Sequence, residues 1–292
     1  MALPKIATIV LTLALTAGCG GGDAVTARTP AEAVTQRLKG SAGVKVSRLV
    51  RLEYGEKAST PPAQDDFVVP VDIGEYSESR TTGVLGATAS DLTATYYQAN
   101  VPDEVKGVVP TDLSFMTTRT ITIAGSGTYE HRADRQDVPA GKSWLHGRDT
   151  GCEPPLRALG VRSLVDPEML RKLAAPTPST GEAVDGVATV VHAGSSPLTD
   201  FAIAAPNDDP ATADQLRERH GATQVSWQLW VGPDRLPRRV RLTSTSPTAE
   251  DDQPETTMIE VEFTDWGADV LIDPPPPAQV HETGTCLAAE PS

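Results

Sequence analysis

The chain has 292 residues and a formal net charge of −14 at pH 7, and 39% of its residues are hydrophobic. A chain this acidic repels nucleic acid and anionic lipid headgroups, which excludes both as partners held by charge. Its length is sufficient for a full hydrophobic core, in one domain or at most two.

The N-terminus has the organisation of an export signal. One positive charge within residues 1–5 precedes an uncharged apolar run, 6–15, which is too short to span a bilayer. Small residues then lead to Cys19, an ending that resembles the lipobox of bacterial lipoproteins, with Thr16 where leucine is usual. We therefore predict a lipoprotein signal peptide over 1–18 and lipidation, including palmitate, of Cys19. The alternative is an ordinary signal peptide that happens to precede a cysteine.

Residues 19–29 are glycine-rich and polar, which predicts a flexible tether ahead of a single domain over 30–292. Two or more acyl chains make anchoring stable, whereas one is marginal. No later stretch is apolar for long enough to cross a membrane. We therefore expect lipid to be the only anchor, with the protein on the extracytoplasmic face of the cell membrane.

The first half of the mature chain predicts one helix followed by short strands. Thr29 is suited to cap a helix that begins at Pro30 and ends before Gly40, with Ala31, Val34 and Leu38 along one side. Residues 44–53 are typical of an extended strand and 55–66 of a loop. Residues 67–113 suggest short strands with little periodicity.

Further elements follow in the middle of the chain. Strands are predicted over 115–124, 128–132 and 142–146, and again over 187–193. Asp166 and Pro167 predict the start of a second helix that ends before Pro176. A third helix, largely solvated, is predicted from Asp209 to Gly221.

The clearest strands come last, where apolar and polar residues alternate. One face would carry Val225, Trp227, Leu229, Val231, Val240, Leu242, Ile259, Val261 and Phe263. The other would carry Ser226, Gln228, Arg239, Arg241, Glu260 and Glu262. This pattern predicts an antiparallel meander with one apolar and one wet face.

Two cysteines remain once Cys19 is assigned to the anchor. Cys152 and Cys286 would lie in a compartment that oxidises thiols, which predicts one disulfide between them. Two free buried thiols are the alternative.

Two segments have recognisable sequences, WQLWVGPDRLPRRVRL at Trp227–Leu242 and FTDWGADVLIDPPPPAQV at Phe263–Val280. They resemble the LolA-like lipoproteins of actinobacteria, related to the LppX/LprAFG group, over roughly the C-terminal half. The resemblance implies a mainly β protein with a few helices: a curved antiparallel sheet, the LolA-like half-barrel, with short helices across its concave face.

The resemblance also implies a function, the binding or transport of a lipid or lipoglycan by its acyl chains in the half-barrel cavity. The implied cavity wall is Trp227, Leu229, Val240, Leu242, Ile259, Val261 and Phe263. Core packing of these residues is the alternative, and the protein would then be a non-enzymatic scaffold or interaction lipoprotein with a closed core. We expect a monomer in either case.

No pattern in the chain indicates catalysis. The histidines are scattered and lack metal-ligand spacing, and the paired acids lack calcium-ligand spacing. The glycines at 125 and 127 do not form the G-x-S-x-G frame of a nucleophile elbow. We therefore expect neither an enzyme nor a cofactor or metal, and rank a hydrolase third.

Overall fold

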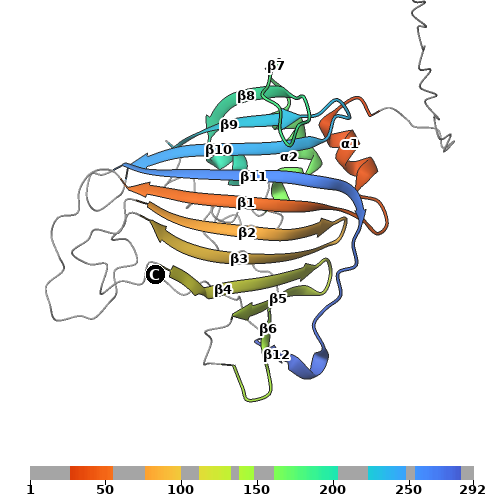
Figure 1. The fold of residues 1–292 in the computed structure, drawn as a ribbon, viewed down its shortest axis with the longest axis vertical. Helices are drawn as coiled ribbons and strands as arrows, with labels where there is room; N and C mark the ends of the chain where they lie inside the picture. Colours follow the sequence, from red (N-terminus) through yellow and green to blue (C-terminus); the bar gives the residue numbers. More distant parts are fainter. Residues whose placement is uncertain are drawn as a thin grey trace, which may run out of the picture.

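A computed structural model describes residues 27–54, 76–99, 112–132, 138–147, 161–202, 223–247 and 254–283. These residues are mainly β and form one open sheet of 12 strands, with two short helices, the single helical turn α3 (Thr199–Ala202) and two 3-10 turns, η1 (Ser163–Val165) and η2 (Pro277–Gln279). The strand order is β12-β6-β5-β4-β3-β2-β1-β11-β10-β9-β8-β7 (Figure 1). All neighbouring pairs are antiparallel except β6 and β12, which are parallel.

The sheet consists of two runs of consecutive strands that meet at its centre. The first run is β1 (Ala42–Tyr54), β2 (Tyr76–Gly86), β3 (Ala89–Ala99), β4 (Asp112–Ile123), β5 (Gly127–Arg132) and β6 (Trp144–Gly147). The second is β7 (Ser179–Thr180), β8 (Val190–Pro197), β9 (Gln224–Val231), β10 (Pro237–Pro247) and β11 (Pro254–Asp269). β1 and β11 pair side by side and join the two runs.

The predicted meander of β9, β10 and β11 is present in register, with Leu242 opposite both Trp227 and Ile259. Residues 67–113 differ from expectation, because β2 and β3 are long strands of 11 residues each. Their sequences mix polar and apolar residues without a regular alternation, and pairing with β1 and β4 holds them in the sheet.

The two helices α1 and α2 start at the positions that their capping residues predicted. In α1 (Pro30–Arg37), Thr29 Oγ1 accepts a hydrogen bond from the Glu32 N–H at 3.2 Å, and the Glu32 carboxylate accepts from the Thr29 N–H. In α2 (Pro167–Leu173), an Asp166 carboxylate oxygen accepts from the Glu168 N–H at 2.8 Å. These bonds satisfy backbone donors that a helix start leaves unpaired.

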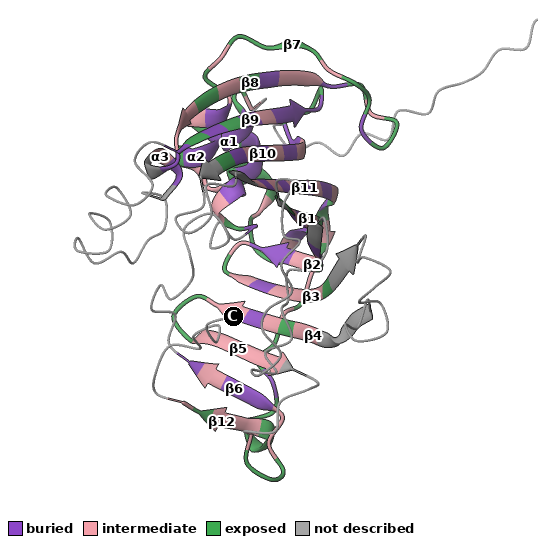
Figure 2. Ribbon diagram, turned by 90° about the vertical axis from the view of Figure 1, so that its left-hand side faces the viewer, coloured by how far each residue is buried: buried purple, intermediate pink, exposed green. Residues whose placement is uncertain are grey.

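One face of the sheet, the helix-bearing face, carries α1, α2 and the single turn α3 (Thr199–Ala202). In Figure 1, α2 lies behind the sheet near β10 and β11, and α1 stands at their right-hand ends; Figure 2 shows β3–β6 extending beyond the labelled helices. Ala33 and Val34 of α1 and Met169, Leu170 and Leu173 of α2 join the buried apolar side chains of the strands in one core cluster. The hydrophobic core therefore occupies only part of this face.

The opposite face carries ion pairs that cross from strand to strand. Arg239 on β10 contacts Glu262 on β11 at 2.7 Å, and Arg241 contacts Glu260 on the same two strands, with Nε and Oε2 2.7 Å apart. The prediction of a wet face opposite an apolar one is confirmed for these residues.

Glu78 is the most buried acid of this face, with 6% of its side chain exposed. Its carboxylate accepts hydrogen bonds from Arg51 on β1 at 2.7 Å and from Arg80 on its own strand at 3.0 Å. Burial acts to raise the pKa of Glu78, but the bonds from the two arginines outweigh it and lower the pKa. The ionised carboxylate therefore stabilises the folded state.

We expect Glu78→Gln to lower the free energy of unfolding by about 1–3 kcal/mol at pH 7, because Arg51 and Arg80 lose their charged acceptor. Because the pKa is lowered on folding, this contribution is full above the unfolded value of 4.5 and is lost as pH falls through the folded value. Urea unfolding at pH 7 and at pH 3 measures both effects. The control is Glu53→Gln on β1, whose side chain is 53% exposed and 3.9 Å from Arg51. Equal stability of the two variants at pH 7 would contradict this account.

A bulge bends β11 near its C-terminal end. Gly43 of β1 stands opposite Ala268 and Lys45 opposite Thr264, so residues 265–267 face the one residue between them. Asp265 and Gly267 have positive φ angles of 52° and 82°. Sequence analysis does not place this irregularity, which allows Trp266 to turn inward and donate from Nε1 to the Pro237 carbonyl at 2.8 Å.

The chain then returns to the far edge of the sheet. Residues 270–276 are followed by the turn η2 (Pro277–Gln279) and by β12 (Val280–Glu282), which pairs with β6. The Ser143 N–H donates to the Gln279 carbonyl at 2.9 Å, and the Thr283 N–H donates to the His146 carbonyl at 3.0 Å. This segment therefore links the central strand β11 to the outermost strand.

The third predicted helix, 209–221, and the sites at Cys19, Cys152 and Cys286 lie outside the described residues. Within the described ranges, no helix is long and apolar enough to cross a membrane.

Candidate functional site

The seven residues predicted as a cavity wall all lie on the helix-bearing face of β9, β10 and β11, and all are buried. Leu229, Val240, Leu242, Ile259 and Val261 have 0% of their surface exposed. Phe263 has 1% exposed, and Trp227 has 7%. The structure brings the seven together as one surface, as the alternation predicted, and places all of them in the core cluster.

Side chains of the helices pack directly on this surface. Phe201 of α3 meets the Trp227 ring edge to face, with the ring centroids 5.8 Å apart. The indole N–H of Trp227 donates to the Leu173 carbonyl at the end of α2, at 3.2 Å. Trp227 therefore connects the sheet to both helical elements through apolar contact and a buried hydrogen bond.

The position of the Trp227 ring depends on a glycine in the next strand. Gly194 on β8 is the cross-strand partner of Trp227. A Cβ atom at Gly194 would overlap the six-membered part of the indole ring, including Cη2 at 2.7 Å. The glycine is thus required for close approach of the ring, a role that the sequence pattern did not reveal.

We expect Gly194→Ala to lower the free energy of unfolding by about 1–3 kcal/mol, because the added methyl group forces the indole out of its place. Thermal unfolding and the tryptophan emission spectrum would record the loss of stability and the ring displacement. Gly186→Ala is not a neutral comparison, since φ there is +75°. Gly86→Ala is better, because the nearest atom to its added Cβ, a Val270 methyl carbon, is 3.5 Å away. Unchanged stability of Gly194→Ala would contradict the assigned role.

Beyond the core cluster, the helix-bearing face continues onto β3. Leu92 is half-buried and packs against the cluster, and Ala94 is also half-buried. Tyr96, the next residue on the same face, is 40% exposed. We call Leu92, Ala94 and Tyr96 the β3 strip. It is an apolar part of this face that is partly accessible, and sequence analysis missed it because 67–113 lacked periodicity.

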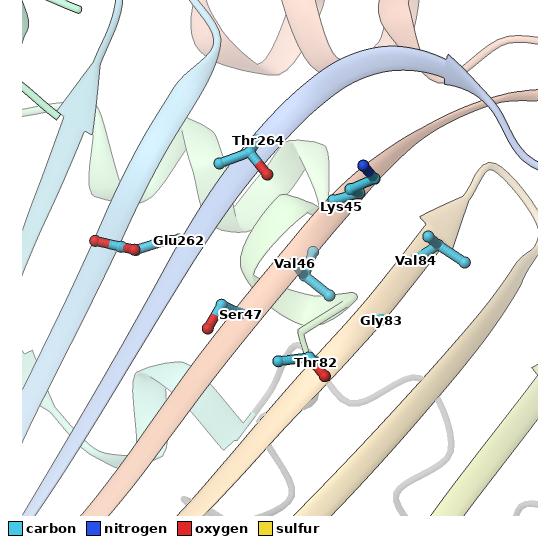
Figure 3. A pocket seen from close by; sticks show the side chains of 8 residues that line it. All are labelled: Lys45, Val46, Ser47, Thr82, Gly83, Val84, Glu262 and Thr264. Carbon is cyan, nitrogen blue, oxygen red and sulfur yellow. The ribbon is translucent and has the colours of Figure 1, made fainter. Parts of the chain in front are cut away.

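A hollow of ≈ 420 Å³ lies on the opposite face, over β11, β1 and β2 (Figure 3). It is lined by Lys45, Val46, Ser47, Thr82, Gly83, Val84, Glu262 and Thr264. Lys45 pairs with Asp265 at 2.8 Å, and Glu262 is held by Arg239. None of the seven predicted wall residues lines this hollow, so it is separate from the predicted site.

His131 on β5 and His146 on β6 each contact an aromatic ring on the opposite face, near the β12 edge. The His146 ring stacks on Tyr129, with centroids 4.2 Å apart, and the His131 ring lies 5.3 Å from that of Trp144. His146 Nδ1 is 2.7 Å from a Glu282 carboxylate oxygen. Within the described ranges no group of three or more His, Cys, Asp or Glu could hold a metal ion. The contact between His146 and Glu282 joins β6 to β12.

Comparison with solved structures shows distant structural similarity. A scan against protein-family models finds no match, and no curated protein matches the chain. Among solved structures, the chain is similar to a DUF1329 family protein from Desulfovibrio piger, with 10% sequence identity and a TM-score of 0.25. The match covers 84% of this chain and 95% of that one. No comparison supports membership of the LolA-like group, and the similarity carries no argument about function.

Proposed function

We propose that this protein is an envelope lipoprotein, anchored through Cys19 on the extracytoplasmic face of the cell membrane, that binds the acyl part of a lipid. In this proposal the open sheet is a LolA-like half-barrel, its concave side is the helix-bearing face, and its activity is binding or transport rather than catalysis. The lipobox and the two C-terminal segments support the setting and the fold.

The observation that carries the proposal is the β3 strip. It continues the apolar surface of the core cluster past the described helices and leaves Tyr96 40% exposed. Exposed apolar surface next to a core is a common place for an apolar ligand. An acyl chain that becomes buried there gains about 0.8 kcal/mol per methylene group, which is ample for binding without a charged contact.

The burial of the seven predicted wall residues changes where the ligand is expected to bind. Trp227 and its six companions were predicted to line the cavity, and they are packed against α2 and α3. We therefore propose that the ligand lies on the β3 strip. The seven residues then form part of the hydrophobic core next to this strip.

The full burial of those seven residues favours a second candidate, a scaffold or interaction lipoprotein with a closed core. Such a protein would expose no acyl-binding surface, and its partner would be another envelope protein. The two candidates differ in one measurable property, the binding of lipid.

The test uses the mature domain from Asp23 onward, expressed in an actinobacterial host and purified without denaturant. Native mass spectrometry is expected to show bound lipid, and a fluorescent fatty acid is expected to bind to the delipidated protein. Ala94→Trp should abolish binding by filling the strip. Thr93→Trp is the matched control, because the neighbouring residue on β3 points to the opposite face. Absence of both lipid and probe binding in the wild type would refute the proposal and favour the scaffold.

The anchor is tested separately in the full chain. We expect the wild-type protein to fractionate with membranes and to incorporate labelled palmitate, and Cys19→Ala to lose both. Cys286→Ser is the control for thiol chemistry, since its thiol lies outside the lipobox, and it should keep both properties even though loss of the predicted disulfide lowers its stability. Palmitate labelling that survives Cys19→Ala would refute the assignment of the anchor.

A further inference from the structure

The β3 strip is a single apolar row between two rows of small or hydroxyl-bearing residues. On the β2 side, its neighbours in register are Ser79, Thr81 and Gly83. On the β4 side, Leu92 stands opposite Thr120 and Ala94 opposite Thr118. Both of these threonines are half-buried and thus remain partly accessible to water. The accessible apolar surface is therefore one strand spacing wide, about 4.8 Å.

This width limits how many acyl chains can lie side by side. A second chain would have to lie over a neighbouring row, where it would remove the hydroxyl groups of Thr118 and Thr120 from water. An acyl chain offers these groups no hydrogen-bond partner, so their burial costs free energy. A single chain covers the apolar row and leaves the threonines in contact with water. The width of the strip therefore favours a ligand with one chain.

The two ends of the strip differ in accessibility. Beyond Leu92, the next residue on this face of β3 is Ser90, which is 6% exposed. Arg162, directly before η1, donates to the Ala87 carbonyl in the β2–β3 turn at 2.8 Å and so fastens η1 to this end. At the other end, Tyr96 is 40% exposed. The strip is thus closed beyond Leu92 and open at Tyr96.

This difference between the ends gives the ligand a direction. The buried end next to the core cluster suits the terminal methyl group of an acyl chain, and the open end suits a polar headgroup. Tyrosine is common at such a boundary, because its ring is apolar and its hydroxyl group is polar. The distance along β3 from Leu92 to Tyr96 is four residues, about 13 Å.

We propose that the β3 strip selects single-chain amphiphiles, such as a fatty acid or a lysophospholipid, over lipids with two or more chains. The methyl end of the chain lies at Leu92, and the headgroup stays in water beside Tyr96. This inference rests on the proposed function and adds the class of ligand to it. It also predicts a limit on chain length, because the closed end stops a longer chain.

The experiment compares two monomeric probes that have the same phosphocholine headgroup and the same number of acyl carbons. One is lysophosphatidylcholine with a single dodecanoyl chain, and the other is phosphatidylcholine with two hexanoyl chains. Each is used to displace a fluorescent fatty acid from the delipidated domain. The single-chain probe should bind at least about hundredfold more tightly, because the other places only one short chain on the strip and each methylene contributes about fourfold.

A series of fatty acids from octanoate to stearate tests the closed end. The affinity should rise with chain length and then level off, because methylene groups beyond the strip gain no apolar contact. Ala94→Trp should abolish binding of the single-chain probe, and Thr93→Trp, on the opposite face of β3, should retain it. Ala94→Leu and its control Thr93→Leu serve if the tryptophan variant does not fold.

Equal or tighter binding of the two-chain probe, or an affinity that keeps rising through stearate, would overturn this inference while leaving the proposed function intact. Binding of the single-chain probe that Ala94→Trp and Ala94→Leu leave unchanged would also overturn it, since the ligand would then lie elsewhere. Failure of every probe to bind the wild type, the fluorescent fatty acid included, would overturn both.

Discussion

Replacing Leu229 by alanine is expected to lower the free energy of unfolding by about 2–5 kcal/mol, without direct loss of a ligand contact. Leu229 has 0% of its surface exposed and lies in the core cluster beneath the described helices. Truncating a side chain in such a place leaves a cavity that the surrounding structure fills only in part. Urea unfolding followed by tryptophan fluorescence measures the change, and the acyl-probe assay measures binding in the same variant.

The matched control is Leu271→Ala, the same substitution at a residue that is 86% exposed. Its effect on stability should stay within about 0.5 kcal/mol, because little apolar contact is lost. If Leu229→Ala kept wild-type stability and instead weakened probe binding, Leu229 would be a cavity wall residue, as the resemblance implied, and the ligand would belong behind the helices.

Removal of the predicted disulfide is expected to have a similarly large effect. Cross-linking Cys152 and Cys286 closes a loop of more than 100 residues, which in the chain-entropy model is worth at most about 5 kcal/mol. Each of the two cysteines follows a described strand, and these two strands pair with each other. β6 and β12 run parallel, with Glu282 opposite His146, so the chain leaves both strands in the same direction. Cys152 follows His146 by six positions and Cys286 follows Glu282 by four.

The domain from Asp23 onward contains only these two cysteines, so its intact mass should rise by two protons on reduction. Cys152→Ser, Cys286→Ser and the double variant should all be destabilised to a similar extent. The similarity matters, because loss of either partner breaks the same bond. Two thiols that react with iodoacetamide in the unreduced, denatured protein would refute the pairing.

Local features were predictable wherever a short stretch of sequence carries the whole signal. The starts of α1 and α2 depend on Thr29 and Asp166 with a proline directly after each, and both caps form as expected. The alternation in β9–β11 separates apolar from charged residues within each strand, and it assigned both faces correctly. These predictions succeed because the physical cause lies within a few residues of its effect.

β2 and β3 could not be predicted from local sequence patterns. Their faces combine Ser79, Thr81 and Ala94 with charged residues, so neither strand has the alternation that would reveal it. Each is stabilised by backbone hydrogen bonds to the neighbouring strands. β2 pairs with β1, and β1 in turn pairs with β11, which lies more than 200 residues further along the chain. Such pairings leave little trace in a local pattern.

The candidate site also has one part that the sequence predicted and another that it did not. The sequence alone determined that nine apolar side chains near the C-terminus share a surface, because side chains alternate along a strand regardless of what covers them. Only the tertiary structure decided that α2 and α3 cover this surface and that the β3 strip continues past them. The reason is that exposure depends on which distant segments pack together, and the chain brings those segments into contact only when it folds.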